Sequence, residues 1–164
     1  MKRIIIIMML IAPMTVMAQK LGHVDSQSLL ISLPEVLKIN GEMEALAKKY
    51  ENEITTMQNE LQRKVDEYYK VESTMSVTDR NETENRLQEM NQRIQDKASQ
   101  IQQDLDKKRE EKMAVVYDKV KTAIQNVGKA GHYTYIFEQN AILYVGTDSK
   151  DVTAEVKAEL KKLK

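Results

Sequence analysis

Histidine and cysteine, which serve most often in acid–base and metal chemistry near neutral pH, are scarce in this chain of 164 residues. His23 and His132 are its two histidines, and cysteine is absent. A histidine can serve as a general base or a metal ligand, but neither stands with a nucleophile motif or with further ligands at metal-site spacing. We therefore expect both histidines to be surface residues at strand ends. The sequence predicts no enzyme activity, no cofactor and no metal site.

Phosphate binding is the other chemistry that a short motif could suggest. The segment 128–131 reads Gly-Lys-Ala-Gly, which is too short for a phosphate loop and fits the end of a helix better. The numerous Asp and Glu residues alternate with Lys and Arg, a pattern typical of solvated ion pairs on helix surfaces. No nucleotide site is predicted.

Residues 34–128 form the longest periodic stretch, with apolar residues at gaps of three and four that fall on one helical face. One limb carries Val36, Ile39, Met43, Leu46, Tyr50, Ile54, Met57, Leu61, Val65 and Tyr68. The other carries Leu87, Met90, Ile94, Ala98, Ile101 and Leu105, then Met113, Val116, Val120, Ile124 and Val127. Two narrow stripes of similar length predict two helices that bury each other as an antiparallel hairpin, which we call the arm.

The boundaries of the arm follow from helix-capping signals. Residues 32–35 (Ser-Leu-Pro-Glu) have the spacing of a capping box with proline in the first turn, and Gly128 and Gly131 supply the stop. Residues 73–79 are rich in hydroxyl and acidic residues and predict the tip, with Ser76 or Asp79 as the cap of the second helix. Asn40 and Gly41 could break the first helix, but the apolar stripe continues through them, so we expect one helix.

The first 18 residues have the composition of a secretory signal peptide: a basic start, a short apolar run and small residues at 16–18. The alternative, an uncleaved membrane anchor, is disfavoured because the run is short and contains Pro13. Cleavage after Ala18 would remove two basic residues and leave 23 basic against 25 acidic residues, a net charge of −2. That balance does not favour nucleic-acid binding.

Residues 19–33 and 129–164 remain outside the arm and predict a small β body with a terminal helix. Residues 20–25 suggest one strand, and 133–138 and 142–145 suggest two antiparallel strands joined by a turn at 139–141. Residues 148–153 read as a polar loop, and a helix follows from Thr153, with Val156, Leu160 and Leu163 on one face. So few residues make a marginal core alone. We therefore expect an α+β, mostly helical protein, with the arm projecting from a body assembled by oligomerisation through Leu21, Val24, Tyr135, Phe137, Ile142 and Tyr144.

Two features of the arm could serve more than the hairpin itself. Residues 104–112 interrupt the second stripe with charges, which indicates either a solvated patch with an ion pair or a point where the helices splay. Apolar residues also crowd the tip, where they either close the hairpin or contact another molecule. These residues, our candidates for binding another molecule, are Tyr68, Tyr69, Val71, Met75 and Val77.

In its order of elements the chain resembles the Skp (OmpH-like) family of periplasmic chaperones. The most specific likeness lies in residues 137–144 (Phe-Glu-Gln-Asn-Ala-Ile-Leu-Tyr) and 150–156 (Lys-Asp-Val-Thr-Ala-Glu-Val), and the opening residues 22–27 are also similar. The resemblance implies a homotrimer with a central β body and three arms. Such a trimer would hold unfolded outer-membrane proteins in the periplasm without ATP.

One departure from the family bears on its partners. Well-known members are strongly basic, whereas this chain is nearly neutral, so we expect peripheral membrane contact to be weak. An alternative from a different functional class is an exported coiled-coil spacer or envelope-assembly factor that holds no client.

Overall fold

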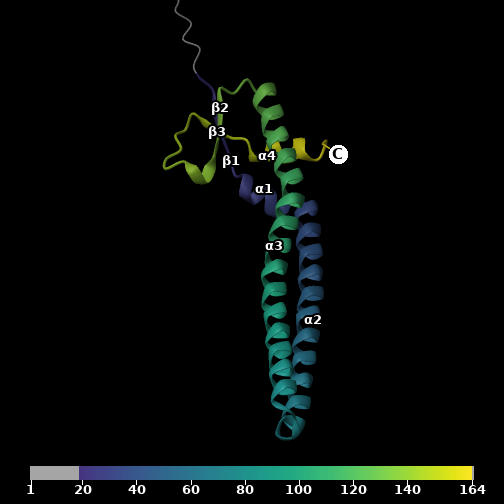
Figure 1. Cartoon of the computed structure of the whole chain (residues 1–164). Coiled ribbons are helices and arrows are strands. Elements are labelled where there is room, and N and C mark those ends of the chain that lie inside the picture. Colours follow the sequence, from purple (N-terminus) through teal and green to yellow (C-terminus); the bar gives the residue numbers. More distant parts are fainter. Residues whose placement is uncertain (1–18, 164) are drawn as a thin grey trace, which may run out of the picture. The chain divides into compact units, whose positions relative to one another are not determined.

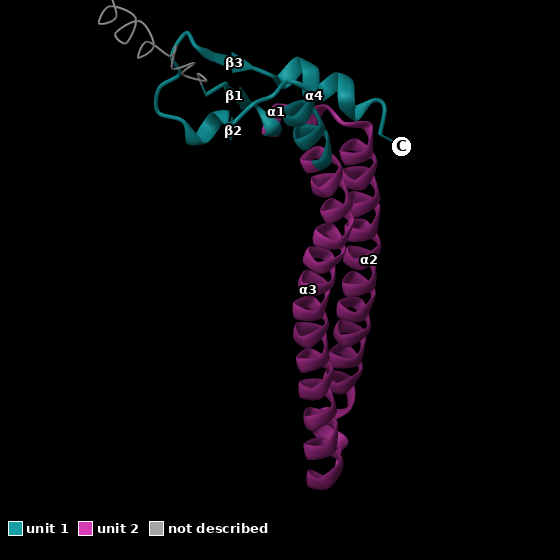
Figure 2. Ribbon diagram, turned by 90° about the horizontal axis from the view of Figure 1, so that it is seen from above, with its two compact units in different colours: residues 1–26, 122–164 teal, residues 27–121 magenta. Residues whose placement is uncertain are grey.

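The computed structural model describes residues 19–163 (Figure 1). The expected signal peptide, residues 1–18, lies outside the described residues. The described chain is mostly helical, as the sequence predicts, with a small sheet of short strands. It divides into two compact units, coloured separately in Figure 2: the body unit, residues 19–26 and 122–163, and the arm unit, residues 27–121.

Two long helices make up most of the arm unit, and residues 122–130 at the end of the second belong to the body unit. Helix α2 spans Pro34–Val71 and α3 spans Val77–Ala130, with the short 3-10 helix η1, Glu72–Thr74, between them. A short helix α1, Ser26–Ser32, precedes them. Helix α2 runs through Gly41 without a break, as expected. A Cβ at Gly41 would meet no atom within 4 Å, so this glycine faces open space and no packing contact depends on it.

The two predicted caps differ in outcome. At the tip, the Ser76 hydroxyl accepts a hydrogen bond from the Asp79 backbone N–H at 3.1 Å and donates to the Asp79 carboxylate at 2.7 Å, so Ser76 is the cap. The capping box at residue 32 was wrong. Ser32 donates its hydroxyl back to the Leu29 carbonyl at 2.8 Å, and Leu33, which has no side-chain oxygen, occupies the N-cap before Pro34.

A series of polar contacts across the seam fixes the register of α2 against α3. Three are ion pairs, Glu35 to Lys119 at 2.6 Å, Glu42 to Lys112 at 2.7 Å and Glu53 to Lys97 at 2.7 Å. Two more are tyrosine hydroxyls that donate to carboxylates, Tyr50 to Asp104 and Tyr68 to Glu84. As the α2 residue number rises, the partner number falls by a similar amount, which defines an antiparallel hairpin with one register.

Apolar packing is densest at the end of the arm unit next to α1. Val36, Ile39, Met43 and Val116 form a buried cluster, with Leu30, Leu33, Leu46, Leu105 and Met113 packed against it. Leu105 lies within the charged segment 104–112 and Met113 directly follows it, yet both reach this cluster, and Lys112 pairs with Glu42. The segment is therefore a charged patch with an ion pair across a closed seam. The alternative, that the two helices splay apart here, was wrong.

The sheet differs from the expected antiparallel pair. Strands β1 (Leu21–Val24), β2 (Tyr135–Glu138) and β3 (Ser149–Asp151) form a sheet in the order β2-β1-β3, and both pairings are parallel. Residues 139–141 are a short 3-10 helix, η2, Gln139–Ala141, and the following residues 142–145 form no strand. The expected loop at 148–153 instead contains β3, so two predictions were wrong: the hairpin and the loop.

Helix α4, Thr153–Leu160, completes the body unit and begins where the sequence predicts. Val156 and Leu160 are buried as expected, and they join Val24, Ala123 and Val152 among the buried apolar residues of this unit. The Asp25 backbone N–H donates to the Thr153 hydroxyl at 3.0 Å, and the Val152 N–H donates to the His23 carbonyl at 2.9 Å. These bonds tie the start of α4 to the central strand.

Candidate functional site

The side chains considered for acid–base and metal chemistry contribute to the fold instead. His23 lies buried in the central strand, and its Nδ1 is 3.0 Å from the Ser149 hydroxyl, so the expected surface position was wrong. Within residues 19–163, no group of three or more His, Cys, Asp or Glu side chains could hold a metal ion. In the same residues, no helix is both long and apolar enough to cross a membrane.

The glycine segment 128–131 ends helix α3. The Tyr133 N–H donates to the Gly128 carbonyl at 3.0 Å, and the His132 N–H donates to the Lys129 carbonyl at 3.3 Å, the two bonds of a Schellman motif. The left-handed residue of that motif is His132, with φ 54°, and not a glycine. Gly131 is required for a different reason, because a Cβ there would lie 2.4 Å from the Tyr133 ring. The geometry of the segment is that of a helix end and does not support phosphate binding.

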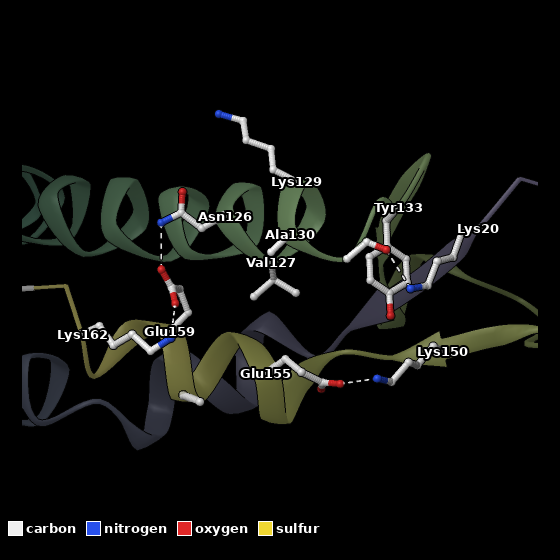
Figure 3. Close-up of a pocket in the computed structure, with 12 residues that line it drawn as sticks. Lys20, Asn126, Val127, Lys129, Ala130, Tyr133, Lys150, Glu155, Glu159 and Lys162 are labelled. Atoms are coloured by element: carbon white, nitrogen blue, oxygen red, sulfur yellow. Dashed lines mark hydrogen bonds and ion pairs between the residues drawn. The ribbon is translucent and has the colours of Figure 1, made fainter.

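A cleft of about 700 Å³ lies in the body unit beside α4 and the end of α3 (Figure 3). Its charged groups are largely paired within the chain: Lys150 with Glu155 at 2.5 Å and Lys162 with Glu159 at 2.9 Å. Each ion pair lowers the pKa of its glutamate through the hydrogen bond from the lysine. Lys20 donates to the Gly131 carbonyl at 2.7 Å and lies over the Tyr133 ring. The cleft is therefore occupied by structural contacts and offers little unpaired charge to a ligand.

The candidate residues at the tip divide into two groups. Tyr68 is 8% exposed and belongs to the seam, where its hydroxyl donates to Glu84 at 2.6 Å and that hydrogen bond raises the pKa of Tyr68 to about 12. Tyr69 is 68% exposed, Val77 is 73% exposed, and Val71 is also exposed, while Met75 is half-buried. The tip therefore presents the second group as an accessible apolar surface, without Tyr68.

The candidate residues of the body also divide by exposure. Val24 is buried, and Leu21 and Ile142 are half-buried. Tyr135 and Phe137 are exposed on β2, with their rings stacked at 5.7 Å between centroids. The segment after η2 carries Leu143 and Tyr144, which are fully exposed and 83% exposed, together with exposed Val145. The body unit thus leaves several large apolar side chains exposed to solvent.

Sequence reasoning missed a further set of exposed apolar residues in the arm unit: Ile31, Leu37, Val115 and Tyr117. Each lies off the apolar stripe, next to a residue that the seam uses, as Leu37 follows Val36 and Val115 precedes Val116. Reading only the periodic positions hides such residues. The sequence does carry a sign of them: an apolar residue next to the apolar stripe, at a position where a solvated helix surface is normally polar.

Comparison with known proteins decides the family. The model of the outer membrane protein (OmpH-like) family matches residues 20–160, nearly the whole described chain. The chain belongs to the OmpH-like family. This OmpH-like chain is 28% identical over 152 residues to the chaperone protein Skp of Yersinia enterocolitica, covering 93% of this chain and 92% of that protein.

Two further matches agree. The chaperone protein Skp of Escherichia coli K12 is 25% identical over 144 residues, with 88% of each chain covered. The crystal structure of an OmpH-like outer membrane chaperone from Caulobacter crescentus CB15 superposes with a TM-score of 0.76 at 17% identity, covering 88% of this chain and 85% of that one. At that identity the superposition supports the fold of the OmpH-like chain and nothing finer.

Proposed function

We propose that this OmpH-like protein is an ATP-independent periplasmic holdase chaperone that binds unfolded outer-membrane β-barrel proteins. The observation that carries the proposal is its similarity over about nine-tenths of its length to proteins named chaperone protein Skp. The sequence features of a signal peptide support export, and the exposed apolar residues of the arm unit supply surface for a client.

A holdase acts by mass action: binding the unfolded client lowers its free concentration and hence its aggregation. Unfolded membrane β-strands alternate apolar and polar residues and expose unpaired edges, so they aggregate readily. Several weak contacts on one assembly can hold such a chain without a deep pocket. The exposed apolar residues at the tip are a surface of that kind.

We further propose that the protein acts as a homotrimer assembled through the body unit. Tyr135, Phe137, Leu143 and Tyr144 expose apolar area that a second and third copy could cover. All strands run parallel and β2 and β3 are both sheet edges, so backbone groups remain available for pairing. A trimer would bring three arms together and multiply their weak client contacts.

The test is aggregation of a denatured outer-membrane β-barrel diluted into buffer with residues 19–164, followed by light scattering. A stoichiometric amount of trimer should suppress scattering, and should still do so at moderate salt, because apolar contact is screened less than Coulomb attraction. Wild-type protein that leaves scattering unchanged would refute the holdase function and support the alternative, an exported coiled-coil spacer or envelope-assembly factor.

The tip can be tested in the same assay. Serine at Tyr69, Val71 and Val77 together should weaken holding while helix content stays unchanged, because these side chains lie outside the seam. Single substitutions should do little, since the remaining contacts compensate. A matched control places serine at three exposed apolar residues away from the tip, Leu37, Val115 and Tyr117. Equal losses in the two variants would move the client surface from the tip to the whole arm.

A further inference from the structure

A notch opens between the two long helices of the arm unit, away from the tip. Its volume is about 240 Å³, and its lining consists of Met57 and Glu60 from α2 and Met90, Arg93 and Ile94 from α3. Ile94 is buried, and the two methionines are half-buried. The volume is below the ~300–1,000 Å³ of small-molecule sites. The notch is therefore sized for a single side chain.

The seam on either side of the notch shows which side chain such a space takes. Towards the tip, Tyr68 spans the seam and donates its hydroxyl to Glu84 at 2.6 Å. Away from the tip, Tyr50 does the same with Asp104. In both places an aromatic ring lies between the helices and its hydroxyl meets a carboxylate of the opposite helix. At the notch the seam residues are methionines, and the chain supplies no ring.

The rim has the groups that would complete the same arrangement. By the register of the seam, Glu60 and Arg93 stand at the same level on opposite helices, yet no ion pair joins these two described residues. Arg93 instead approaches Glu89 on its own helix at 3.9 Å, and both of those side chains are largely exposed. A contact that long and that exposed contributes little. One carboxylate and one guanidinium thus remain at the rim, with no net charge between them.

We propose that the notch is a binding site for a tyrosine side chain of an unfolded polypeptide. The thioethers of Met57 and Met90 contact the ring, since sulfur–aromatic contacts are favourable and methionine adapts its shape. Arg93 stacks on the ring face, and Glu60 accepts the phenol hydrogen bond as Glu84 does for Tyr68. The neutral rim favours an uncharged residue. This site rests on the proposed holdase function, whose clients carry aromatic residues near both ends of their membrane strands.

Methionine methyl NMR can test the site, because residues 19–164 contain five methionines. Met57 and Met90 line the notch, Met75 reports on the tip, and Met43 and Met113 pack in the apolar cluster at the opposite end of the arm unit from the tip. The probe is a soluble peptide that alternates tyrosine with serine and threonine, and the matched control carries leucine for tyrosine. The tyrosine peptide should shift the Met57 and Met90 signals saturably by ring current, with Met43 and Met113 unmoved. The leucine peptide should cause no such ring-current shift.

A pair of rim variants tests the polar part. Arg93→Gln should weaken binding of the tyrosine peptide about two- to fivefold, the loss expected for one exposed cation–π contact. The matched control is Arg86→Gln, on the same helix with the same type of exposed ion pair, Arg86 to Glu82 at 3.5 Å. That variant should bind as the wild type does. Glu60→Gln should reduce the preference for the tyrosine peptide over a phenylalanine peptide.

The outcomes separate this site from the function it rests on. If wild type suppresses client aggregation and the peptide shifts Met75 alone, the client binds at the tip and the notch proposal is overturned. Unmoved signals from all five methionines also overturn it. If wild type fails to suppress aggregation, the holdase function falls, while saturable shifts at Met57 and Met90 would still establish the notch as a site for aromatic side chains.

Discussion

The apolar cluster of the arm unit gives the sharpest test of what holds the hairpin together. Met43 is 4% exposed and packs with Val36, Ile39 and Val116, so Met43→Ala removes buried methylene groups and the thioether from a packed site. Buried Met→Ala changes cost ~2–5 kcal/mol. A seam between two helices encloses the site less fully than a globular core, so we expect the lower part of that range, about 2–3 kcal/mol of unfolding free energy. The corresponding fall in melting temperature is about 5–10 °C.

The measurement is urea denaturation followed by circular dichroism at 222 nm, at one fixed protein concentration because oligomerisation would shift apparent stability. The control is Leu37→Ala in the same helix, where a 63% exposed side chain should cost less than ~0.5 kcal/mol. Hydrogen exchange should quicken for amides around Met43 and leave α4 unchanged, since local stability follows local packing. If the two variants unfolded at the same urea concentration, the assignment of the seam to this face of α2 would be refuted.

Three further predictions concern other parts of the chain. His132→Gly should raise the unfolding free energy by ~1 kcal/mol, because glycine relieves the left-handed backbone at φ 54°; an unchanged urea midpoint would contradict this. Phe137→Asp should dissociate the proposed trimer or prevent folding, as light scattering would show; a folded wild-type monomer at micromolar concentration would instead remove the trimer from the proposal.

The third of these predictions is loss of stability in acid. The hydrogen bond from Lys119 lowers the pKa of Glu35, and those from Tyr50 and Lys108 lower the pKa of Asp104. Their stabilisation is therefore complete above the unfolded-state pKa, about 4, and is lost as pH falls through the folded-state values. Urea midpoints should be level from about pH 7 to 5 and decline below that. Midpoints that rise on acidification would contradict the assignment.

The hairpin was predictable because its evidence is local and repeated. A period of three and four residues over ten or more positions defines a helix face, and a cluster of turn formers between two such stretches defines the reversal. The cap at Ser76 followed from residues three apart. The seam departs from the predicted apolar stripe at Ala98. That residue is exposed, and its neighbour Lys97 faces the seam and forms an ion pair with Glu53.

The sheet was less predictable because its pairings join distant parts of the chain. Residues 142–145 have strand composition but lie outside the sheet, and β3 has the polar sequence Ser-Lys-Asp. A short edge strand can be polar because solvent surrounds it, so composition did not reveal it. Residues 25–134 separate β1 from β2 and residues 25–148 separate it from β3, so nothing local encodes the parallel pairing. The exposure of residues off the stripe likewise needed the structure, as did the notch.

The stability of the arm unit and the proposed client contact at the tip draw on different residues. The seam uses buried apolar residues together with polar contacts that fix one register, such as Tyr68 to Glu84. Tyr69 and Val77 lie outside it and keep most of their surface in contact with solvent when the chain folds, so they contribute little to the free energy of folding. Substituting them should leave the urea midpoint unchanged. Any loss of client holding in such a variant then reports contact with the client and not damage to the hairpin.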